Sequence, residues 1–305
     1  MVQTFLQPLP HGITLSCRAA GERGRPVLLF LHGFPEGAFV WDYFLDHFSQ
    51  AQHGGYRCIA PNLRGFERSS APPHASAYRP KHLVQDIAAL IALETAGQGD
   101  TLAALVAHDW GGAVAWNLAN QLPHLAQRLM IVNSPHPGTF LRELQNNPAQ
   151  QAASAYMNFL IRPDAERLLA QDDYRRLWNF FSAPGQTAGP SWLTQAVKDQ
   201  YRAVWGFGLT GGCNLYRASP LRPPTQDDPA AAAVSLPDAM LTVQLPTLVV
   251  WGMDDIALPP VLLYGLGHFV RDLTLRTIDH ATHWVLHEQP ALVTRYLQDF
   301  LLRHP

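Results

Sequence analysis

The 305-residue sequence has few cysteines and no strong charge of either sign. Its three cysteines, Cys17, Cys58 and Cys213, lie far apart and lack metal-ligand spacing, which favours packed thiols in a reduced intracellular setting. The formal net charge of −2 and the pI near 6.7 provide no basic field that would attract nucleic acid or anionic lipid. We therefore expect no nucleic-acid partner.

Targeting and membrane segments are also missing from the sequence. The N-terminal stretch MVQTFLQPLPHG lacks a basic region followed by an apolar core, which argues against a secretory signal. No apolar run approaches the roughly 20 residues that a membrane span requires. These absences predict a cytoplasmic protein without a membrane partner, and we expect a monomer or a homodimer.

Short apolar runs alternate with helical patterns along much of the chain. This order is typical of an α/β fold, in which helices flank a mostly parallel sheet. Ligands of such folds bind beyond the carboxyl ends of the strands. The runs that we predict to be strands are 27–31, 57–60, 102–107, 128–132, 247–251 and 273–278.

The strand pattern disappears between Pro137 and about Leu245, where the sequence is helical in pattern and interrupted by Pro and Gly. We predict that this part, residues 137–245, forms a helical cap. Residues 1–136 and 246–305 would then form the core domain into which the cap is inserted.

The stretch AHDWGG, residues 107–112, joins the end of an apolar run to the start of a helical pattern. A nucleophile elbow, G-x-S-x-G, needs small residues two positions before and after the nucleophile, because its sharp turn leaves no room for larger ones. Here Ala107 and Gly111 flank Asp109. Asp109 can also be explained as a helix cap, but its central position favours a carboxylate nucleophile and disfavours a serine esterase.

A carboxylate nucleophile forms an ester with its substrate, and the water that cleaves this ester needs a base. Histidine suits this role when an acid holds its second ring nitrogen. The chain order nucleophile, acid, histidine selects Asp255 and His283. Asp254 competes with Asp255, whereas His280 and His287 compete with His283, which we prefer because it ends a loop where a helical pattern begins.

The stretch HGFP, residues 32–35, follows an early predicted strand. A loop in this place and the residue after the nucleophile normally present N–H groups to an oxyanion. By position these residues are Phe34 and Trp110, although a tight turn alone also explains the proline. The loop after residue 132 offers Asn133 in place of a carboxylate, which removes the main rival position for the acid. We expect the substrate pocket to include His32, Pro35, His108, Phe159 and Trp284.

Five stretches in this order resemble the α/β-hydrolase superfamily and, within it, the epoxide hydrolases. They are LLFLHGFPE (28–36), APNLRGFERSS (60–70), AHDWGGAVAW (107–116), VVWGMDDIAL (249–258) and ATHWVLHEQP (281–290). The resemblance implies an α/β-hydrolase fold and an enzyme that converts an epoxide to a vicinal diol through an ester of Asp109, without cofactor or metal. Haloalkane and haloacetate dehalogenases share the Asp nucleophile and the order of the motifs, and they stay an alternative.

The cap distinguishes these activities, because epoxide hydrolases use two cap tyrosines as the acid on the epoxide oxygen. The stretches YMNFLIRPDAE and GGCNLYRAS resemble the family's two tyrosine segments and nominate Tyr156 and Tyr216. A phenol stays protonated at neutral pH without special burial. Each tyrosine can instead be a packing residue. Tyr201 and Tyr174 are then the alternative candidates for the acid role.

Dehalogenases need other groups, which stabilise the halide or bind a substrate carboxylate. Many haloalkane dehalogenases have Asn where this sequence has Phe34, and fluoroacetate dehalogenases place arginines just after the nucleophile, where it has Trp110 and Ala113. The elbow thus lacks a carboxylate clamp, although Arg64 or a cap arginine can replace one. A binding module would predict a broken triad, whereas this triad is whole. The aromatic candidates for the pocket predict a small-molecule partner, an apolar or aryl epoxide.

Overall fold

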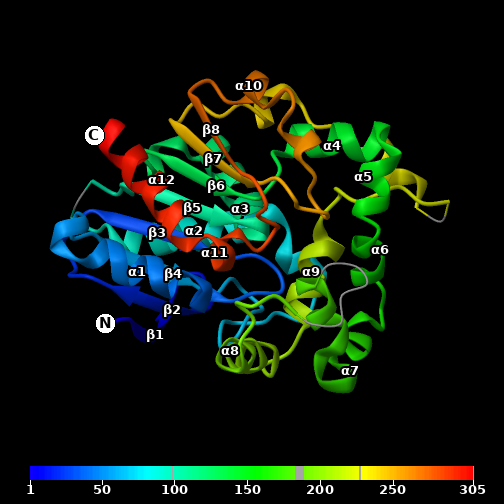
Figure 1. The fold of residues 1–305 in the computed structure, drawn as a ribbon, viewed down its shortest axis with the longest axis horizontal. Helices are drawn as coiled ribbons and strands as arrows, with labels where there is room; N and C mark the ends of the chain where they lie inside the picture. The colour runs from blue at the N-terminus through cyan, green and yellow to red at the C-terminus, as the bar shows by residue number, and fades with distance from the viewer. Residues whose placement is uncertain (98, 183–188, 227, 305) are drawn as a thin grey trace.

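The computed structural model describes residues 1–97, 99–182, 189–226 and 228–304. Within these residues it contains an eight-stranded sheet with the order β1-β2-β4-β3-β5-β6-β7-β8 (Figure 1). The pairs β1–β2 and β2–β4 are antiparallel, and all later neighbours in this order, from β4 to β8, are parallel. The strands are β1 (Gln3–Pro8), β2 (Thr14–Ala20), β3 (Val27–Leu31), β4 (Arg57–Pro61), β5 (Ala104–His108), β6 (Leu129–Val132), β7 (Thr247–Gly252) and β8 (Leu273–Ile278).

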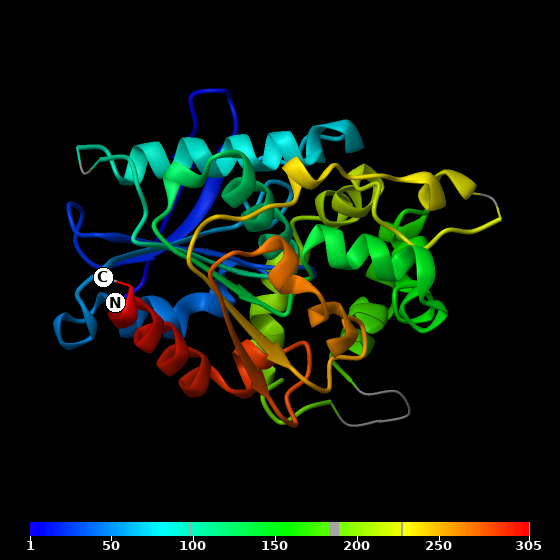
Figure 2. The ribbon, with the colours of Figure 1, turned by 90° about the horizontal axis from the view of Figure 1, so that it is seen from above.

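Helices cover both faces of this sheet, as the view from above shows (Figure 2). On one face lie α2 (Pro80–Glu94) and α3 (Asp109–Gln121), and on the other lie α1 (Asp42–Ser49) and α12 (Pro290–Arg303). Two short helices, α10 (Leu266–Phe269) and α11 (Val285–Glu288), follow β7 and β8. The α/β class predicted from the alternating pattern is confirmed.

The other helices come between β6 and β7 in the chain and lie together beside the sheet (Figure 1). They are α4 (Pro137–Asn146), α5 (Pro148–Ala153), α6 (Tyr156–Leu160), α7 (Ala165–Trp178), α8 (Gln195–Trp205) and α9 (Thr210–Ala218).

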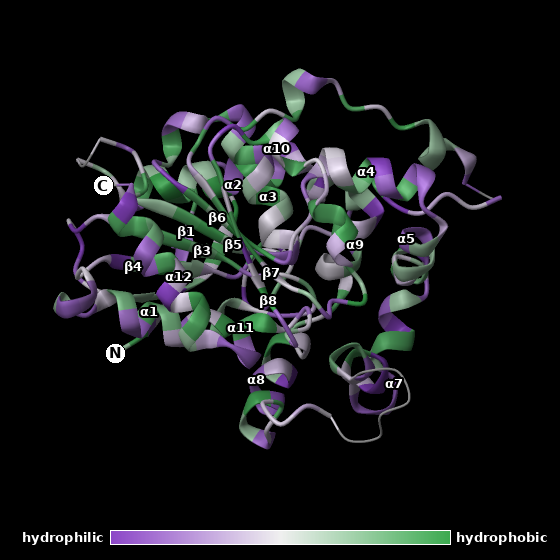
Figure 3. Ribbon diagram, turned by 45° about the horizontal axis from the view of Figure 1, so that its top comes forward, coloured by the Kyte–Doolittle hydropathy of each residue, from purple (hydrophilic) through white to green (hydrophobic). Residues whose placement is uncertain are grey.

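The central strands are buried along their whole length, which explains why they form continuous apolar runs in the sequence (Figure 3). Each of the six predicted runs corresponds to a strand. The bounds of β3 and β8 are as predicted, and the other four strands have ends shifted by one or two residues. The largest shift is at β5, which begins at Ala104, because Leu102 forms only an isolated bridge to Ala126.

Strands β1 and β2 have no counterpart among the predicted runs. β1 is an edge strand with alternately exposed and half-buried residues, and β2 carries Ser16 and Arg18 among its apolar residues. Neither strand therefore gives the continuous apolar run that identified the others.

The cysteines are free and buried, as predicted. Among the residues that the structure describes, no helix combines the length and the apolar character needed to cross a membrane.

Candidate active site

Asp109 stands at a strained turn between β5 and α3. Its φ of 47° is in the left-handed region, which non-glycine residues rarely occupy and which is often found at functional sites. The neighbouring backbone leaves no space for side chains. A Cβ on Gly33 would lie 2.4 Å from the Asp109 Cβ, and one on Gly111 would lie 2.4 Å from the Leu31 carbonyl oxygen. The elbow geometry that the flanking small residues predicted is present.

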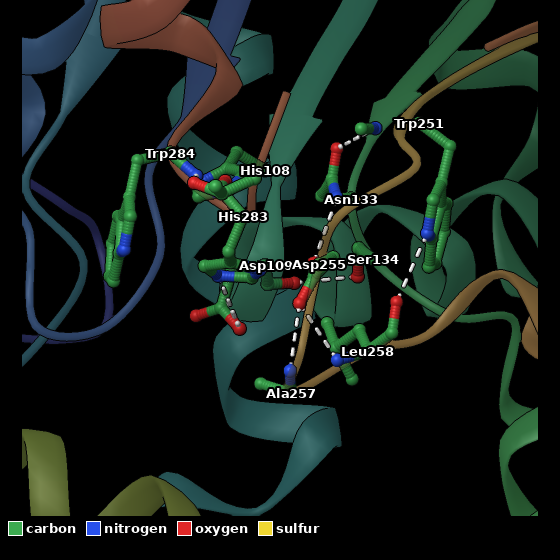
Figure 4. Close-up of polar contacts among 12 residues, drawn as sticks. His108, Asp109, Asn133, Ser134, Trp251, Asp255, Ala257, Leu258, His283 and Trp284 are labelled. Carbon is green, nitrogen blue, oxygen red and sulfur yellow. Dashed lines mark hydrogen bonds and ion pairs between the residues drawn. The ribbon is translucent and has the colours of Figure 1, made fainter. Parts of the chain in front are cut away.

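Asp109 begins α3, whereas Asp255 and His283 lie in the loops after β7 and β8. The three side chains meet beyond the carboxyl ends of β5, β7 and β8 (Figure 4). His283 Nδ1 lies 2.7 Å from Asp255 Oδ2, and His283 Nε2 lies 3.8 Å from Asp109 Oδ2. Since a carboxylate accepts, Nδ1 donates the first hydrogen bond, and Nε2 faces Asp109. The competing residues Asp254 and His280 do not join this triad. Their side chains are 58% and 95% exposed and lie 3.8 Å from each other.

The carboxylate of Asp255 is fully enclosed by hydrogen-bond donors. Its Oδ1 accepts from the amides of Ala257 and Leu258, at 3.0 and 2.8 Å. Its Oδ2 accepts from Asn133 Nδ2 at 2.8 Å as well as from His283 (Figure 4). The Asn133 Oδ1 in turn accepts from the Gly252 amide at 2.9 Å. Asn133 therefore orients the acid from the position that a rival acid would occupy if a carboxylate stood there.

The pKa of His283 depends on opposing effects. Burial alone would lower it, but the charge and the hydrogen bond of Asp255, with the charges of Asp109 and Glu36, raise it from 6.5 to about 9. At neutral pH the resting site therefore holds an imidazolium between two carboxylates.

This raised pKa predicts a loss of stability at alkaline pH. A group whose pKa is raised by folding stabilises the protein fully below the unfolded pKa, and the contribution disappears as the pH rises through the folded pKa. Between about pH 6 and pH 10, we expect wild type to lose about 3 kcal/mol more unfolding free energy than His283→Gln, given the shift from 6.5 to about 9. Urea unfolding at both pH values measures this difference, and parallel pH curves would contradict it.

The predicted oxyanion donors border the nucleophile. The Phe34 amide donates to Asp109 Oδ1 at 2.7 Å, which leaves Oδ2 as the oxygen nearer to His283. Trp110 is the second residue of α3, so its N–H belongs to the first helical turn, where amides have no partner within the helix.

A cavity of about 860 Å³ opens onto Asp109 and His283. Tyr156 of α6 and Tyr216 of α9 line it, with ring centroids 6.1 Å apart. Burial raises the pKa of both phenols well above the ordinary tyrosine range, so both stay protonated and can donate. The aromatic side chains of the wall are Phe34, Tyr156, Phe180, Phe181, Tyr216 and Trp284.

Three residues that we expected in the pocket do not line this cavity. The Phe159 ring instead packs within 6.0 Å of the guanidinium groups of Arg162 and Arg176. His32 is fully buried, and its Nε2 accepts from the Leu63 amide at 3.0 Å. His108 turns away from the cavity as well, into a buried cluster behind the triad. Pro35 and Trp284 do line the cavity, as expected.

The buried cluster centres on Glu36, which the sequence analysis missed. Glu36 Oε1 accepts from Tyr201 Oη at 2.8 Å and lies 2.9 Å from His287 Nε2, while Oε2 lies 3.0 Å from His108 Nδ1. Burial would raise the pKa of Glu36, but the two histidines outweigh it and hold the pKa below the usual range. Because His108 Nε2 must donate to the His283 carbonyl at 3.0 Å, the cluster is linked to the triad. The cluster also includes Tyr201, a reserve candidate for the acid, and His287, a competing candidate for the base. Neither residue lines the cavity.

Comparison with known proteins agrees with this geometry. The model of the alpha/beta hydrolase fold family matches residues 26–290. Epoxide hydrolase 4 of Homo sapiens is 30% identical, with 95% of this chain and 76% of the human protein covered.

Two solved structures are also similar. One, described among novel epoxide hydrolases from metagenomes of hot environments, is 35% identical, with 98% of both chains covered and a TM-score of 0.83. The other is a variant of the Bacillus megaterium epoxide hydrolase with its product (R)-3-[1]naphthyloxy-propane-1,2-diol, at 28% identity, 97% and 99% coverage and a TM-score of 0.83. The chain belongs to the α/β-hydrolase superfamily and, within it, to the family of the epoxide hydrolases.

Proposed function

We propose that this protein hydrolyses epoxides to vicinal diols through a covalent ester of Asp109. The observation that carries the proposal is a carboxylate at the elbow that shares one cavity with two buried phenols, those of Tyr156 and Tyr216. A carboxylate can attack an epoxide carbon, and a protonated phenol can donate to the oxygen that leaves it. A serine at the elbow would instead favour acyl transfer.

In the first step, Asp109 Oδ2 attacks a ring carbon while Oδ1 is held by the Phe34 amide. A C–O bond forms to Asp109, and the C–O bond of the epoxide breaks. The electron pair moves to the ring oxygen, which takes a proton from a tyrosine hydroxyl. The product of this step is a hydroxyalkyl ester and a phenolate.

In the second step, His283 takes a proton from water, and the hydroxide attacks the ester carbonyl of Asp109. The alkylated Asp109 no longer carries the negative charge that helps to raise the pKa of His283, so the imidazolium releases its proton more easily. The amides of Phe34 and Trp110 stabilise the tetrahedral oxyanion. The proton that His283 released reaches the phenolate through solvent and restores the tyrosine. Collapse breaks the C–O bond between the Asp109 carbonyl carbon and the substrate oxygen, and the departing alkoxide takes the remaining proton of the attacking water, which yields the diol, the Asp109 carboxylate and the imidazolium of the resting site.

We infer that residues 137–245, with helices α4 to α9, act as the cap and residues 1–136 and 246–305 as the core. The cap then supplies both acid groups, and the core supplies the nucleophile and base.

The aromatic wall and the 860 Å³ volume support apolar or aryl epoxides as substrates, and the naphthyloxy diol bound by the Bacillus megaterium relative supports the same class. Three buried free cysteines support a cytoplasmic setting; a monomer or homodimer stays a prediction.

The test is the formation of diol from styrene oxide and phenyl glycidyl ether by the purified protein, followed by chromatography. We expect diol from both substrates and none from an Asp109→Ala control. Chloroacetate and 1-chlorobutane are assayed for halide release in parallel. Halide release without diol from either epoxide would reject the proposal in favour of a dehalogenase.

Asn133 provides a finer test of how Asp255 is held. We expect Asn133→Ala to lower kcat about tenfold, because Asp255 loses a donor and the Gly252 amide loses its acceptor. The unfolding free energy should fall by about 1–3 kcal/mol, the usual effect of leaving a buried polar group unpaired. Asn146→Ala, which alters an exposed amide of α4, is the matched control. Equal kcat values for the two variants would contradict the role of Asn133.

A further inference from the structure

The cavity mouth carries a carboxylate that the proposed mechanism does not use. Asp254 and Ile256 line the cavity, and each is more than half exposed, with 58% of the Asp254 side chain and 63% of Ile256 accessible to solvent. The neighbouring Asp255 carboxylate is completely buried in the triad. The two adjacent acids therefore lie in different environments: Asp255 is buried in the triad, and Asp254 lies at the opening of the cavity.

Charge in the cavity is unbalanced at this opening. Among the described residues that line it, Asp109, Asp254 and His283 can carry charge, and none is Lys or Arg. The imidazolium of His283 offsets Asp109, which faces its Nε2 at 3.8 Å. Within the described part of the chain, the ion pair of Asp254 is with His280, whose Nδ1 lies at 3.8 Å and whose side chain is 95% exposed. The carboxylate at the mouth therefore has no permanent cationic partner in the wall.

We propose that Asp254 is a specificity-determining residue that makes the mouth select against epoxides with an anionic tail and in favour of neutral or cationic ones. This inference rests on the proposed function, because it assumes that the epoxide lies at Asp109 and that the rest of the substrate extends to the opening. Two unit charges 4 Å apart in water interact by about 1 kcal/mol, which is about fivefold in kcat/KM. The wall offers no carboxylate clamp that would reverse this preference.

The test compares three substrates of one shape: phenyl glycidyl ether, its para-carboxylate and its para-trimethylammonium derivative. We expect wild type to hydrolyse the carboxylate with the lowest kcat/KM. In Asp254→Asn, the kcat/KM ratio of the carboxylate to the neutral ether should rise about fivefold, whereas Asp254→Glu should keep the wild-type ratio. About 1 M salt should reduce the discrimination of wild type, because it screens exposed charges beyond about 3 Å.

Asp272→Asn is the matched control, because it removes the same charge at the exposed start of β8, at the opposite end of the strand from the site. Its substrate ratio should equal that of wild type. A damaged Asp255 in Asp254→Asn would lower all three rates together without changing the ratio. An unchanged ratio in Asp254→Asn would overturn the inference.

A binding measurement separates this inference from the proposed function. Calorimetry with 1-naphthylacetamide and 1-naphthylacetate compares a neutral and an anionic ligand without any turnover. If wild type hydrolyses none of the epoxides, the proposed function fails, and a fivefold gain in the acetate-to-acetamide affinity ratio in Asp254→Asn would still support the charge selection. An equal affinity ratio in wild type and variant would reject it.

Discussion

His283→Gln is expected to react once with an epoxide and then stop, with the opened substrate retained as an ester on Asp109. Glutamine keeps a polar side chain near Asp255 but cannot take a proton from water at neutral pH. The attack of Asp109 on the epoxide does not need this base, since the Phe34 amide already holds the carboxylate at 2.7 Å. Steady-state diol formation should therefore fall by about 10²- to 10⁴-fold, the usual contribution of a general base.

Intact-protein mass spectrometry measures the trapped intermediate. After incubation with phenyl glycidyl ether, His283→Gln should gain the mass of one epoxide molecule, and peptide mapping should locate it on Asp109. The double variant with Asp109→Asn should gain nothing. His280→Gln changes the exposed neighbouring histidine and should turn over without accumulating an adduct. An adduct at any other residue, or wild-type turnover in His283→Gln, would refute the two-step scheme.

The central sheet and the triad could be predicted because their sequence signals are local. A strand buried on both faces is a continuous apolar run, and the elbow marks Asp109 by the small residues around it. Chain order then limited the acid to the neighbouring Asp254 and Asp255, and the structure distinguishes them by burial. β1 and β2 gave no such signal, since one lies at the edge and the other mixes polar and apolar residues.

Side-chain partnerships across the fold were not predictable from the same patterns. Glu36 meets His108 and His287, which lie 72 and 251 residues away in the chain, only after the strands have been assembled. His108 ends β5, one residue before the nucleophile, and its side chain turns to this cluster and not to the cavity. Phe159 lies only three residues after Tyr156 in the same short helix, α6, but its ring packs against Arg176 of α7, a contact that the spacing alone does not indicate.

Replacement of both phenols that line the cavity, Tyr156→Phe with Tyr216→Phe, is expected to lower kcat/KM for diol formation by at least about 10³-fold. Opening an epoxide without an acid leaves an alkoxide in an apolar cavity, where an unpaired charge is strongly disfavoured. The raised pKa of both phenols makes them weak acids, so they act by hydrogen bonding the oxygen as its charge develops and by giving up a proton only to the alkoxide. Each single variant keeps one donor and should lose much less.

The rings remain in the double variant, so the packing of Tyr216 against Phe34 and Trp110, at 5.3 and 5.0 Å between ring centroids, should be retained. Circular dichroism checks the fold, and Tyr174→Phe is the control, because that ring packs on Trp205 at 5.2 Å and does not line the cavity. Rapid-quench measurement should show that formation of the Asp109 ester, and not its hydrolysis, is the slowed step. An unchanged kcat/KM for diol formation would leave the Asp109 mechanism standing but would require another acid, because kcat/KM reports ester formation even where ester hydrolysis limits kcat.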